Sequence, residues 1–447
     1  MIYSRVHGPK RSIGRTGVFS KIRLRLIPFM FLLYVVAYLD RVNIGFAILQ
    51  MDKDLGFGPQ VFGRGAGIFF LGYTLFEVPS NLLMARVGAR IWIARIMIVW
   101  GLVSAAMMYV DSVPLFYAAR FLLGVAEAGF FPGMILYLTY WFPASERAKS
   151  VAQFMTGTAI ANVIGGPLSG LLLTLDGAMG LRGWQWLFVL EGIPAVLLGI
   201  FVLYYLTEGP ADARWLTADE RKWLIARMEA DRASRVSGHE SSSLKAALTS
   251  PRVWYFGLLY FTIVVGFYGI TFWLPQIMKS LSGFSNVKIG LISAIPYVIA
   301  AVVMVVVATS SDRTGERRWH VAIPSFLSAA GLILSASTSD PMLSLAALSL
   351  AAAGIWAALG PFWSLPTAFL TGAAAAGGIA LINSLGNLGG FLSPMLIGEI
   401  RARTESFALA LYVLSAAPFL TGMLVLFGVR GGALRTEKAP EPLQDPT

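Results

Sequence analysis

The sequence predicts an all-α membrane protein of about twelve transmembrane helices. Of its 447 residues, 56% are hydrophobic and only 13% are charged, and the mean hydropathy is +0.69. A soluble domain carries about 25% charged residues, so most of this protein's surface cannot face water. The apolar residues are gathered into runs of about 20 or more, which is the length that an α-helix needs to cross a bilayer.

The first apolar run, from about Leu26, is longer than the hydrophobic segment of a signal peptide and lacks a small-residue cleavage site. We therefore expect it to remain in the protein as the first membrane helix. The apolar runs predict helices over residues 24–49, 61–86, 91–110, 113–141, 148–175, 184–206, 252–279, 286–311, 319–338, 341–364, 376–400 and 405–429.

The net charge is +11, and the distribution of the basic residues along the chain indicates the topology of the predicted helices. With the N-terminus placed in the cytoplasm, 26 of the 35 Lys and Arg residues fall on the cytoplasmic side and 7 on the other side. This asymmetry is the positive-inside rule, and it predicts cytoplasmic termini in the inner (cytoplasmic) membrane. The basic charge needs no nucleic-acid partner to explain it; the expected surroundings are the lipid bilayer.

The longest polar stretch, residues 207–251, divides the predicted helices into two groups of six. Within it, Thr217 and Glu220 have the spacing of a capping box, which predicts the start of an amphipathic helix. That helix is expected on the cytoplasmic membrane surface with Trp215 and Trp223 at the interface. A solvated linker is an equally good interpretation.

Two short matches indicate that the six-helix unit is duplicated. Residues 86–90 (RVGAR) match residues 313–317 (RTGER), and residues 162–166 (NVIGG) resemble residues 387–390 (NLGG). The two pairs agree in offset, 227 and 225 residues, and lie at equivalent helices. Such repeats place a ligand near the membrane midplane between the halves. The predicted domains are 1–206, 207–251, 252–430 and a disordered cytoplasmic tail at 431–447.

Several segments resemble the major facilitator superfamily. Residues 311–318 (SDRTGERR) are similar to its D-R-x-G-x-R-R loop motif, and residues 120–124 (RFLLG) to its R-x-x-x-G motif. Residues 38–43 (YLDRVN), 127–133 (EAGFFPG) and 184–192 (WQWLFVLEG) resemble the anion:cation symporter branch, and residues 77–81 and 215–223 its tartrate- and phthalate-type permeases. The resemblance covers residues 22–430.

This resemblance implies a proton-coupled symporter that imports a small organic anion, such as a hydroxy-dicarboxylate, a sugar acid or an aromatic carboxylate. It departs from the superfamily pattern at Ala85, where the loop motif usually carries aspartate. Hydrolase, zinc and phosphate-loop patterns do not occur in the sequence, which predicts no enzyme activity, no cofactor and no metal. We expect a monomer.

Ionisable residues inside the apolar runs are the first candidates for function, because a charge in hydrocarbon is costly. Arg120 and Glu127 are seven residues apart and share one helix face. Asp40 and Arg41 are adjacent, so they point about 100° apart and only one of them faces the centre of the protein. Glu191 lies deep, but the sequence gives it no partner.

The resemblance implies that Arg41 and Arg120 bind the substrate anion and that Asp40 and Glu127 take up protons. An arginine suits a carboxylate because its planar fork donates two parallel hydrogen bonds. The remaining candidates are Tyr38 and Tyr73 as hydroxyl donors, Asn383, Asn387 and Trp363 as neutral contacts from the second half, and Glu77, Asp312 and Arg313 as gating residues.

Competing interpretations remain open for these residues. The charged group on helices 1 and 4 fits a structural ion-pair lock, and the asparagines fit helix packing beside Gly386, Gly389 and Gly390 as well as ligand contact. For Tyr38 and Trp363 packing is the preferred interpretation. The alternative functions are an anion exchanger and a passive channel for organic acids.

Overall fold

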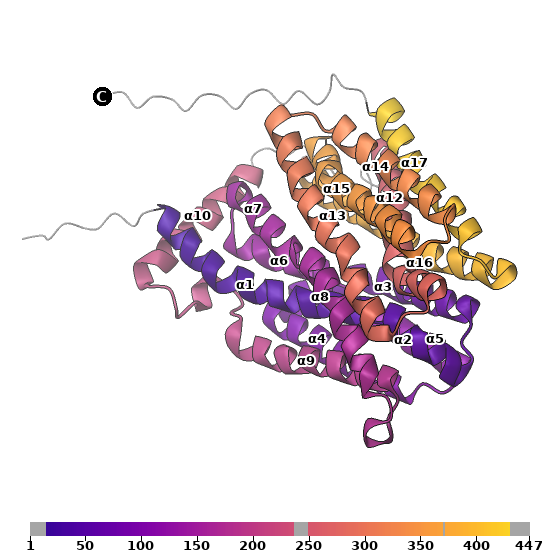
Figure 1. The fold of residues 1–447 in the computed structure, drawn as a ribbon. Coiled ribbons are helices and arrows are strands. Elements are labelled where there is room, and N and C mark those ends of the chain that lie inside the picture. Colours follow the sequence, from indigo (N-terminus) through magenta and orange to yellow (C-terminus); the bar gives the residue numbers. More distant parts are fainter. Residues whose placement is uncertain (1–14, 237–248, 370–371, 430–447) are drawn as a thin grey trace, which may run out of the picture.

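The computed structural model describes residues 15–236, 249–369 and 372–429, and within these ranges every regular element is helical. Twelve helical segments in this part of the chain are long and apolar enough to cross a membrane, as the sequence predicts. The predicted tail at 431–447 and the first fourteen residues lie outside the described residues. Figure 1 shows the two halves of the chain side by side.

The first half contains α1 (Arg15–Val42), α2 (Ile44–Leu55), α3 (Pro59–Val87), α4 (Ala89–Ala106), α5 (Val113–Glu127), α6 (Phe130–Trp141), α7 (Ala144–Met155), α8 (Gly157–Leu172) and α9 (Gly183–Tyr205). After the linker helix α10 (Ala218–Val236), the second half contains α12 (Pro251–Ser282), α13 (Asn286–Thr314), α14 (Arg318–Ala336), α15 (Pro341–Phe369), α16 (Gly372–Thr404) and α17 (Ala408–Gly428).

Two spans of the first half are broken near their candidate site residues. The first span is interrupted at Asn43, between α1 and α2, and the fourth at Ala128 and Gly129, between α5 and α6. Gly129 has φ +85°, and a Cβ there would lie 2.4 Å from the Ser80 hydroxyl, so only glycine fits this bend. Broken membrane helices commonly line ligand sites.

The linker begins with the predicted capping box. The Thr217 amide donates to the Glu220 carboxylate at 2.8 Å, and the Glu220 amide donates to the Thr217 hydroxyl at 3.3 Å. Lys21 of α1 forms a 2.9 Å ion pair with Glu220, and this hydrogen bond lowers the pKa of the Glu220 carboxyl. The linker helix is therefore tied to the first half as well as capped.

The linker tryptophans pack onto the first half, a contact that neither sequence interpretation included. The Trp215 ring stacks on Trp141 with 5.5 Å between centroids, and Trp223 meets Phe19 edge-on at 5.4 Å. Leu224 is fully buried beside them. The apolar face of α10 is thus covered by protein, and this contact holds the linker against the first six-helix group.

The two halves meet most closely at the face opposite the termini. Because α1 begins and α17 ends on one face, the start of α3 and the end of α16 lie on the other. A Cβ built on Gly63 would lie 2.3 Å from the Pro394 carbonyl oxygen, and one on Gly398 would lie 2.4 Å from that of Pro59. These helices therefore pack backbone against backbone.

A second seam joins α8 to α13 in the same way. A Cβ on Gly166 would lie 2.5 Å from the Gly290 carbonyl oxygen, and one on Gly170 would lie 2.8 Å from that of Asn286. In the predicted repeat, α13 corresponds to α3 and α16 to α8, so each seam is the repeat-related copy of the other. This confirms two pseudo-symmetric halves.

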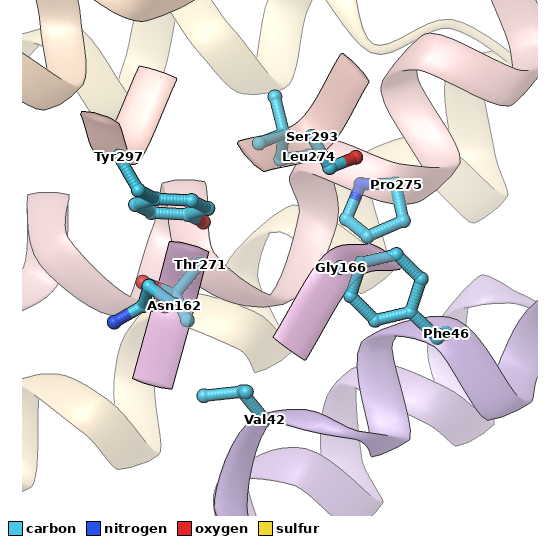
Figure 2. Close-up of a pocket in the computed structure, with 9 residues that line it drawn as sticks. All are labelled: Val42, Phe46, Asn162, Gly166, Thr271, Leu274, Pro275, Ser293 and Tyr297. Carbon is cyan, nitrogen blue, oxygen red and sulfur yellow. The ribbon is translucent and has the colours of Figure 1, made fainter. Parts of the chain in front are cut away.

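A small cavity remains beside the second seam (Figure 2). Its volume is about 10 Å³, close to what one water molecule needs. Asn162 from the first half and Thr271, Ser293 and Tyr297 from the second half provide its polar lining. The seam is thus tightly closed, with polar groups held inside it.

Gly166→Val should open this face, because the added side chain collides with backbone that cannot move aside alone. Overpacking of about 1–3 kcal/mol disfavours the closed state. The chain has no cysteine, so Ser293→Cys provides a single reporter. We expect a membrane-impermeant maleimide added on the face opposite the termini to label it at least about 5-fold faster in the Gly166→Val background.

Gly360→Val is the matched control, since the nearest atom to a Cβ there is 3.6 Å away. Its labelling rate should equal that of the reporter alone. Equal rates for Gly166→Val and Gly360→Val would contradict the assignment of this seam as the closed end.

Candidate functional site

A buried ion pair joins the first and fourth spans. Arg41, at the end of α1, bonds through Nη2 to Glu127 Oε1 at the end of α5, and both side chains are buried. Arg41 Nη1 also donates to the Tyr268 hydroxyl of α12 at 3.2 Å. The pair therefore links two spans of the first half to the second half. Sequence analysis missed Tyr268, because nothing distinguishes it from other aromatic residues in an apolar run.

Aromatic rings surround the two arginines. The Arg41 guanidinium lies 5.2 Å from the Tyr73 ring centroid and 5.8 Å from that of Tyr38. Phe69 contacts both arginines, with its ring centroid 5.6 Å from the Arg41 guanidinium and 5.0 Å from the Arg120 guanidinium. The negative ring faces attract both cations and offset part of their mutual repulsion.

Arg120 on α5 is fully buried and only partly bonded. Its Nε donates to the Gly65 carbonyl oxygen at 3.2 Å, whereas Nη1 and Nη2 have no hydrogen-bond partner among the described residues. A buried guanidinium with two unbonded nitrogens is unfavourable unless an anion satisfies them. Arg120 therefore presents a free fork inside the protein.

Glu127 lies near Arg120, as their spacing predicts, but its ion pair is with Arg41. The break after Glu127 ends α5 at this residue and turns its carboxylate toward helix α1. The ion pair between helices 1 and 4 thus joins Arg41 to Glu127 and does not include Arg120.

Asp40 points away from Arg41, as expected for adjacent helical residues. Its carboxylate accepts hydrogen bonds from the Trp100 indole and the Ser104 hydroxyl of α4, and from the Asn43 amide at 3.2 Å. It is buried and lies behind α1, between helices of the first half. The adjacent residues Asp40 and Arg41 therefore contact different parts of the protein: Asp40 contacts α4, and Arg41 contacts α5 and α12.

Glu77 bridges the two halves. Its carboxylate accepts from Asn383 at 2.9 Å and from Ser384 at 3.5 Å, both on α16, and Asn387 also interacts with it. The two asparagines that were candidates for substrate contact are thus engaged with Glu77. Trp363 packs against Tyr260 with 4.8 Å between ring centroids, which agrees with the packing interpretation.

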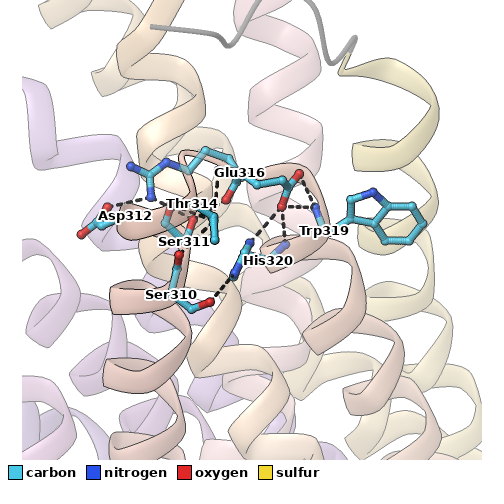
Figure 3. Close-up of polar contacts among 8 residues, drawn as sticks. Ser310, Ser311, Asp312, Thr314, Glu316, Trp319 and His320 are labelled. Carbon is cyan, nitrogen blue, oxygen red and sulfur yellow. Dashed lines mark hydrogen bonds and ion pairs between the residues drawn. The ribbon is translucent and has the colours of Figure 1, made fainter. Parts of the chain in front are cut away.

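The loop after α13 is folded on itself (Figure 3). Asp312 pairs with Arg317 at 2.7 Å, and the Arg317 guanidinium donates to the Ser311 hydroxyl at 2.8 Å. Glu316 accepts from the first amides of α14, at 2.9 Å from Trp319. Arg313 is exposed at the same loop.

The corresponding loop of the first half obtains its carboxylate from another segment. Ala85 stands where the superfamily motif usually has aspartate, and Glu208 from the linker fills the gap. Glu208 accepts from the Arg90 amide at 3.3 Å and lies 3.6 Å from the Arg90 guanidinium. A Cβ on Gly88, where φ is +103°, would collide with this carboxylate. Both loops therefore carry an acidic group against the start of the next helix.

Comparison with known protein families identifies the family to which this chain belongs. A model of the Major Facilitator Superfamily matches residues 30–394. The chain belongs to the Major Facilitator Superfamily. Its function is therefore transport across a membrane by a multi-pass protein, and the superfamily contains transporters and not enzymes.

Individual relatives agree with this superfamily assignment. A protein of Agrobacterium vitis named "Putative tartrate transporter" is 52% identical over 414 residues, which cover 93% of this chain and 94% of that protein. The "Inner membrane transport protein RhmT" of Escherichia coli (strain K12) is 41% identical over 418 residues, 93% of this chain and 95% of the relative.

The fold resembles a structure described as the partially occluded inward open conformation of the xylose transporter XylE from E. coli. The TM-score is 0.73 at 15% identity, and the alignment covers 92% of this chain and 98% of that one. This transporter therefore has the twelve-helix architecture of the superfamily, arranged in two six-helix halves.

Tyr268→Phe should weaken substrate binding in this transporter, because it removes the hydroxyl that positions Arg41 from the second half. One hydrogen bond of about 1 kcal/mol corresponds to a loss of about 5-fold in affinity. Calorimetry of the purified protein measures the effect, with tartrate, the compound in the name of the Agrobacterium vitis relative, as the probe. Tyr204→Phe, at an exposed tyrosine, should bind as the wild type does. Equal affinities for both variants would show that Tyr268 does not support the site.

Proposed function

We propose that this transporter is a symporter that imports a small organic anion, such as a hydroxy-dicarboxylate, a sugar acid or an aromatic carboxylate, together with protons. The observation that supports the proposal is the free fork of Arg120, whose buried Nη1 and Nη2 have no partner among the described residues. A carboxylate matches this fork with two parallel hydrogen bonds.

The rest of the site supports the same substrate class. Arg41 also lies over the Phe69 ring, 5.6 Å from its centroid, so a second carboxylate has a second guanidinium within the same group. The Tyr73 and Tyr38 rings adjoin Arg41, where their hydroxyl groups can contact substrate oxygens. Tartrate, the substrate named for the Agrobacterium vitis relative, carries two carboxylates and two hydroxyls and suits this set.

The ion pair between Arg41 and Glu127 provides the route to proton coupling. A substrate carboxylate that takes Arg41 leaves Glu127 buried without its cation. Loss of the positive neighbour in a poorly hydrated site favours proton uptake by that carboxyl. Anion and proton then bind with positive cooperativity. Asp40 is the second proton site, so a dicarboxylate travels with two protons.

Glu77, Asp312 and Arg313 are the proposed gating residues. Glu77 and Asn383 form a contact between the halves that must change when the halves move. Asp312 and Arg313 lie on the loop at the face that carries the termini, where Asp312 forms a salt bridge with Arg317. The Lys and Arg distribution supports a cytoplasmic position for this face, in the inner membrane.

An anion exchanger and a passive channel are the alternative functions. An exchanger uses the same arginines but accumulates no substrate in response to a pH gradient. A channel needs a continuous polar path, whereas the glycine seams close one face of the structure. Uptake into proteoliposomes with and without an imposed pH gradient separates a symporter from the other two functions, and uptake with and without organic anion inside the vesicles separates an exchanger from a channel.

Arg120→Lys should lose most of the affinity for tartrate while the protein still reaches the membrane. Lysine keeps the charge but lacks the planar fork, and the change at a buried charge pair is about 2–5 kcal/mol. This corresponds to a loss of at least about 30-fold. Wild-type binding by Arg120→Lys would make this arginine structural and would remove the main support for the proposal.

Glu127→Gln should separate binding from coupling. The amide imitates the protonated carboxyl, so tartrate counterflow between equal pH values should continue. Accumulation driven by a pH gradient should fall to the level of the gradient-free control, because Glu127 is the carboxyl that loses its cation when the anion binds, and proton uptake there is what links the two binding events. Retained uphill accumulation would exclude Glu127 as the coupling residue and leave Asp40 as the candidate.

A further inference from the structure

The small cavity beside the second seam lies on the inner side of the glycine contact. Asn162 precedes Gly166 by four residues on α8, which runs toward the seam, and Ser293 follows Gly290 by three residues on α13, which runs away from it. Three or four residues make about one helical turn, so both side chains lie one turn below the contact. The cavity is therefore under the closed face, toward the middle of the membrane.

The same cavity adjoins the residues that hold Arg41. Val42, which directly follows Arg41, lines it, and so does Thr271 on α12. Thr271 is three residues after Tyr268, whose hydroxyl accepts from Arg41. Three residues rise about 4.5 Å along a helix, a distance that a short hydroxy acid can bridge. The cavity is thus about one helical turn from the Arg41 contact, on the side of the seam.

The hydroxyl of Ser293 has no partner in this cavity. The side chain is 1% exposed, and its Oγ forms no hydrogen bond with any described residue. A helical serine commonly donates to the carbonyl one turn earlier, as Ser325 of α14 does to Val321 at 2.7 Å. A buried hydroxyl without a partner is unfavourable, so helix packing does not explain Ser293. Its hydroxyl is available to a ligand, as donor or as acceptor.

The other polar groups of the lining complete a neutral set. The Thr271 hydroxyl donates to the Phe267 carbonyl oxygen at 2.8 Å and keeps an oxygen that can accept. The Asn162 amide donates to the Thr158 carbonyl oxygen at 2.8 Å, and its own oxygen is an acceptor. Tyr297 adds a hydroxyl to the same lining (Figure 2). Among the described residues that line the cavity, none is charged.

The size and the chemistry of this set select one kind of group. The cavity volume of about 10 Å³ is close to what one water molecule needs, and a hydroxyl group has the size of a water molecule. A carboxylate is larger and finds no cation here. A methylene fits the space but leaves the polar lining unpaired, which is how a site built for a hydroxyl rejects an analogue without it.

We propose that Asn162, Thr271, Ser293 and Tyr297 form a subsite for a hydroxyl group of the transported acid, so that the protein prefers a hydroxylated acid to a plain one. This inference rests on the proposed function, in which the arginines bind the carboxylates. It gives a specificity role to residues that the sequence did not connect with the substrate. Ser293 carries the clearest test, because its hydroxyl has no other partner among the described residues.

Tartrate and succinate test the subsite, because they share a carbon chain and both carboxylates and differ only in hydroxyl groups. In calorimetry of the purified wild type, tartrate should bind at least about 5-fold more tightly than succinate, which corresponds to one hydrogen bond. Ser293→Ala should lower the affinity for tartrate by about 5-fold and leave that for succinate unchanged. Ser325→Ala is the matched control, a buried serine of the same half, and should change neither affinity.

Thermal unfolding without a ligand separates a binding role from a structural one. Ser293→Ala removes a buried hydroxyl that has no partner, so the unfolding midpoint of the empty protein should stay the same or rise. A structural serine gives the opposite pattern. A lower midpoint, with an equal loss of affinity for both acids, would overturn the subsite.

The remaining outcomes distinguish this inference from the proposed function. If Ser293→Ala abolishes the preference for tartrate, but the wild type accumulates neither acid under a pH gradient, the symport is contradicted and the subsite stands. If the wild type accumulates tartrate, and Ser293→Ala leaves the ratio of the two affinities unchanged, the symport stands and the subsite is overturned. A wild type that binds neither acid overturns both.

Discussion

The burial of two guanidinium groups inside the membrane-spanning part of the first half is the constraint on which the rest of this site depends. A charge in hydrocarbon is unfavourable by several kcal/mol or more, so each arginine needs compensation. Arg41 obtains it from Glu127, from Tyr268 and from aromatic faces. Arg120 has a carbonyl oxygen, the Phe69 face and the nearby carboxylates of Asp40 and Glu127, but its Nη1 and Nη2 have no hydrogen-bond partner among the described residues.

The two arginines are therefore compensated unequally, and this makes the two ends of the site different. The paired arginine ties the first and fourth spans to the second half, and the other keeps two buried nitrogens without a hydrogen-bond partner among the described residues. Because both guanidinium groups contact the Phe69 ring, the charge of one is within electrostatic reach of the other. The helix breaks at Asn43 and Gly129 make this possible, since they end α1 and α5 beside the charged side chains.

The seams define how the halves can move around this site. Helices that touch through glycine at Gly63 and Gly398, or at Gly166 and Gly290, have no side chains to interdigitate and can separate and re-form as rigid bodies. The contacts nearer the termini are polar and long-range, as between Glu77 and Asn383. A closed backbone seam at one face and exchangeable hydrogen bonds toward the other suit a protein that alternates between two openings.

The sequence determined the number of spans, their approximate ends and the duplication, because hydrophobic length and repeated motifs are local properties of the chain. It also identified Asp40, Arg41, Arg120 and Glu127 as candidates, since ionisable residues stand out within apolar runs. Its helical geometry correctly separated the directions of Asp40 and Arg41.

Only the tertiary structure decided the partners. The pairing of Glu127 with Arg41, the contact of Tyr268 with the same arginine and the hydrogen bond from Ser169 to Glu191 join residues from different helices. Glu208 likewise replaces a missing loop carboxylate from more than 100 residues away. Spacing along one helix fixes which face a side chain is on, but the packing of neighbouring helices determines what it meets there.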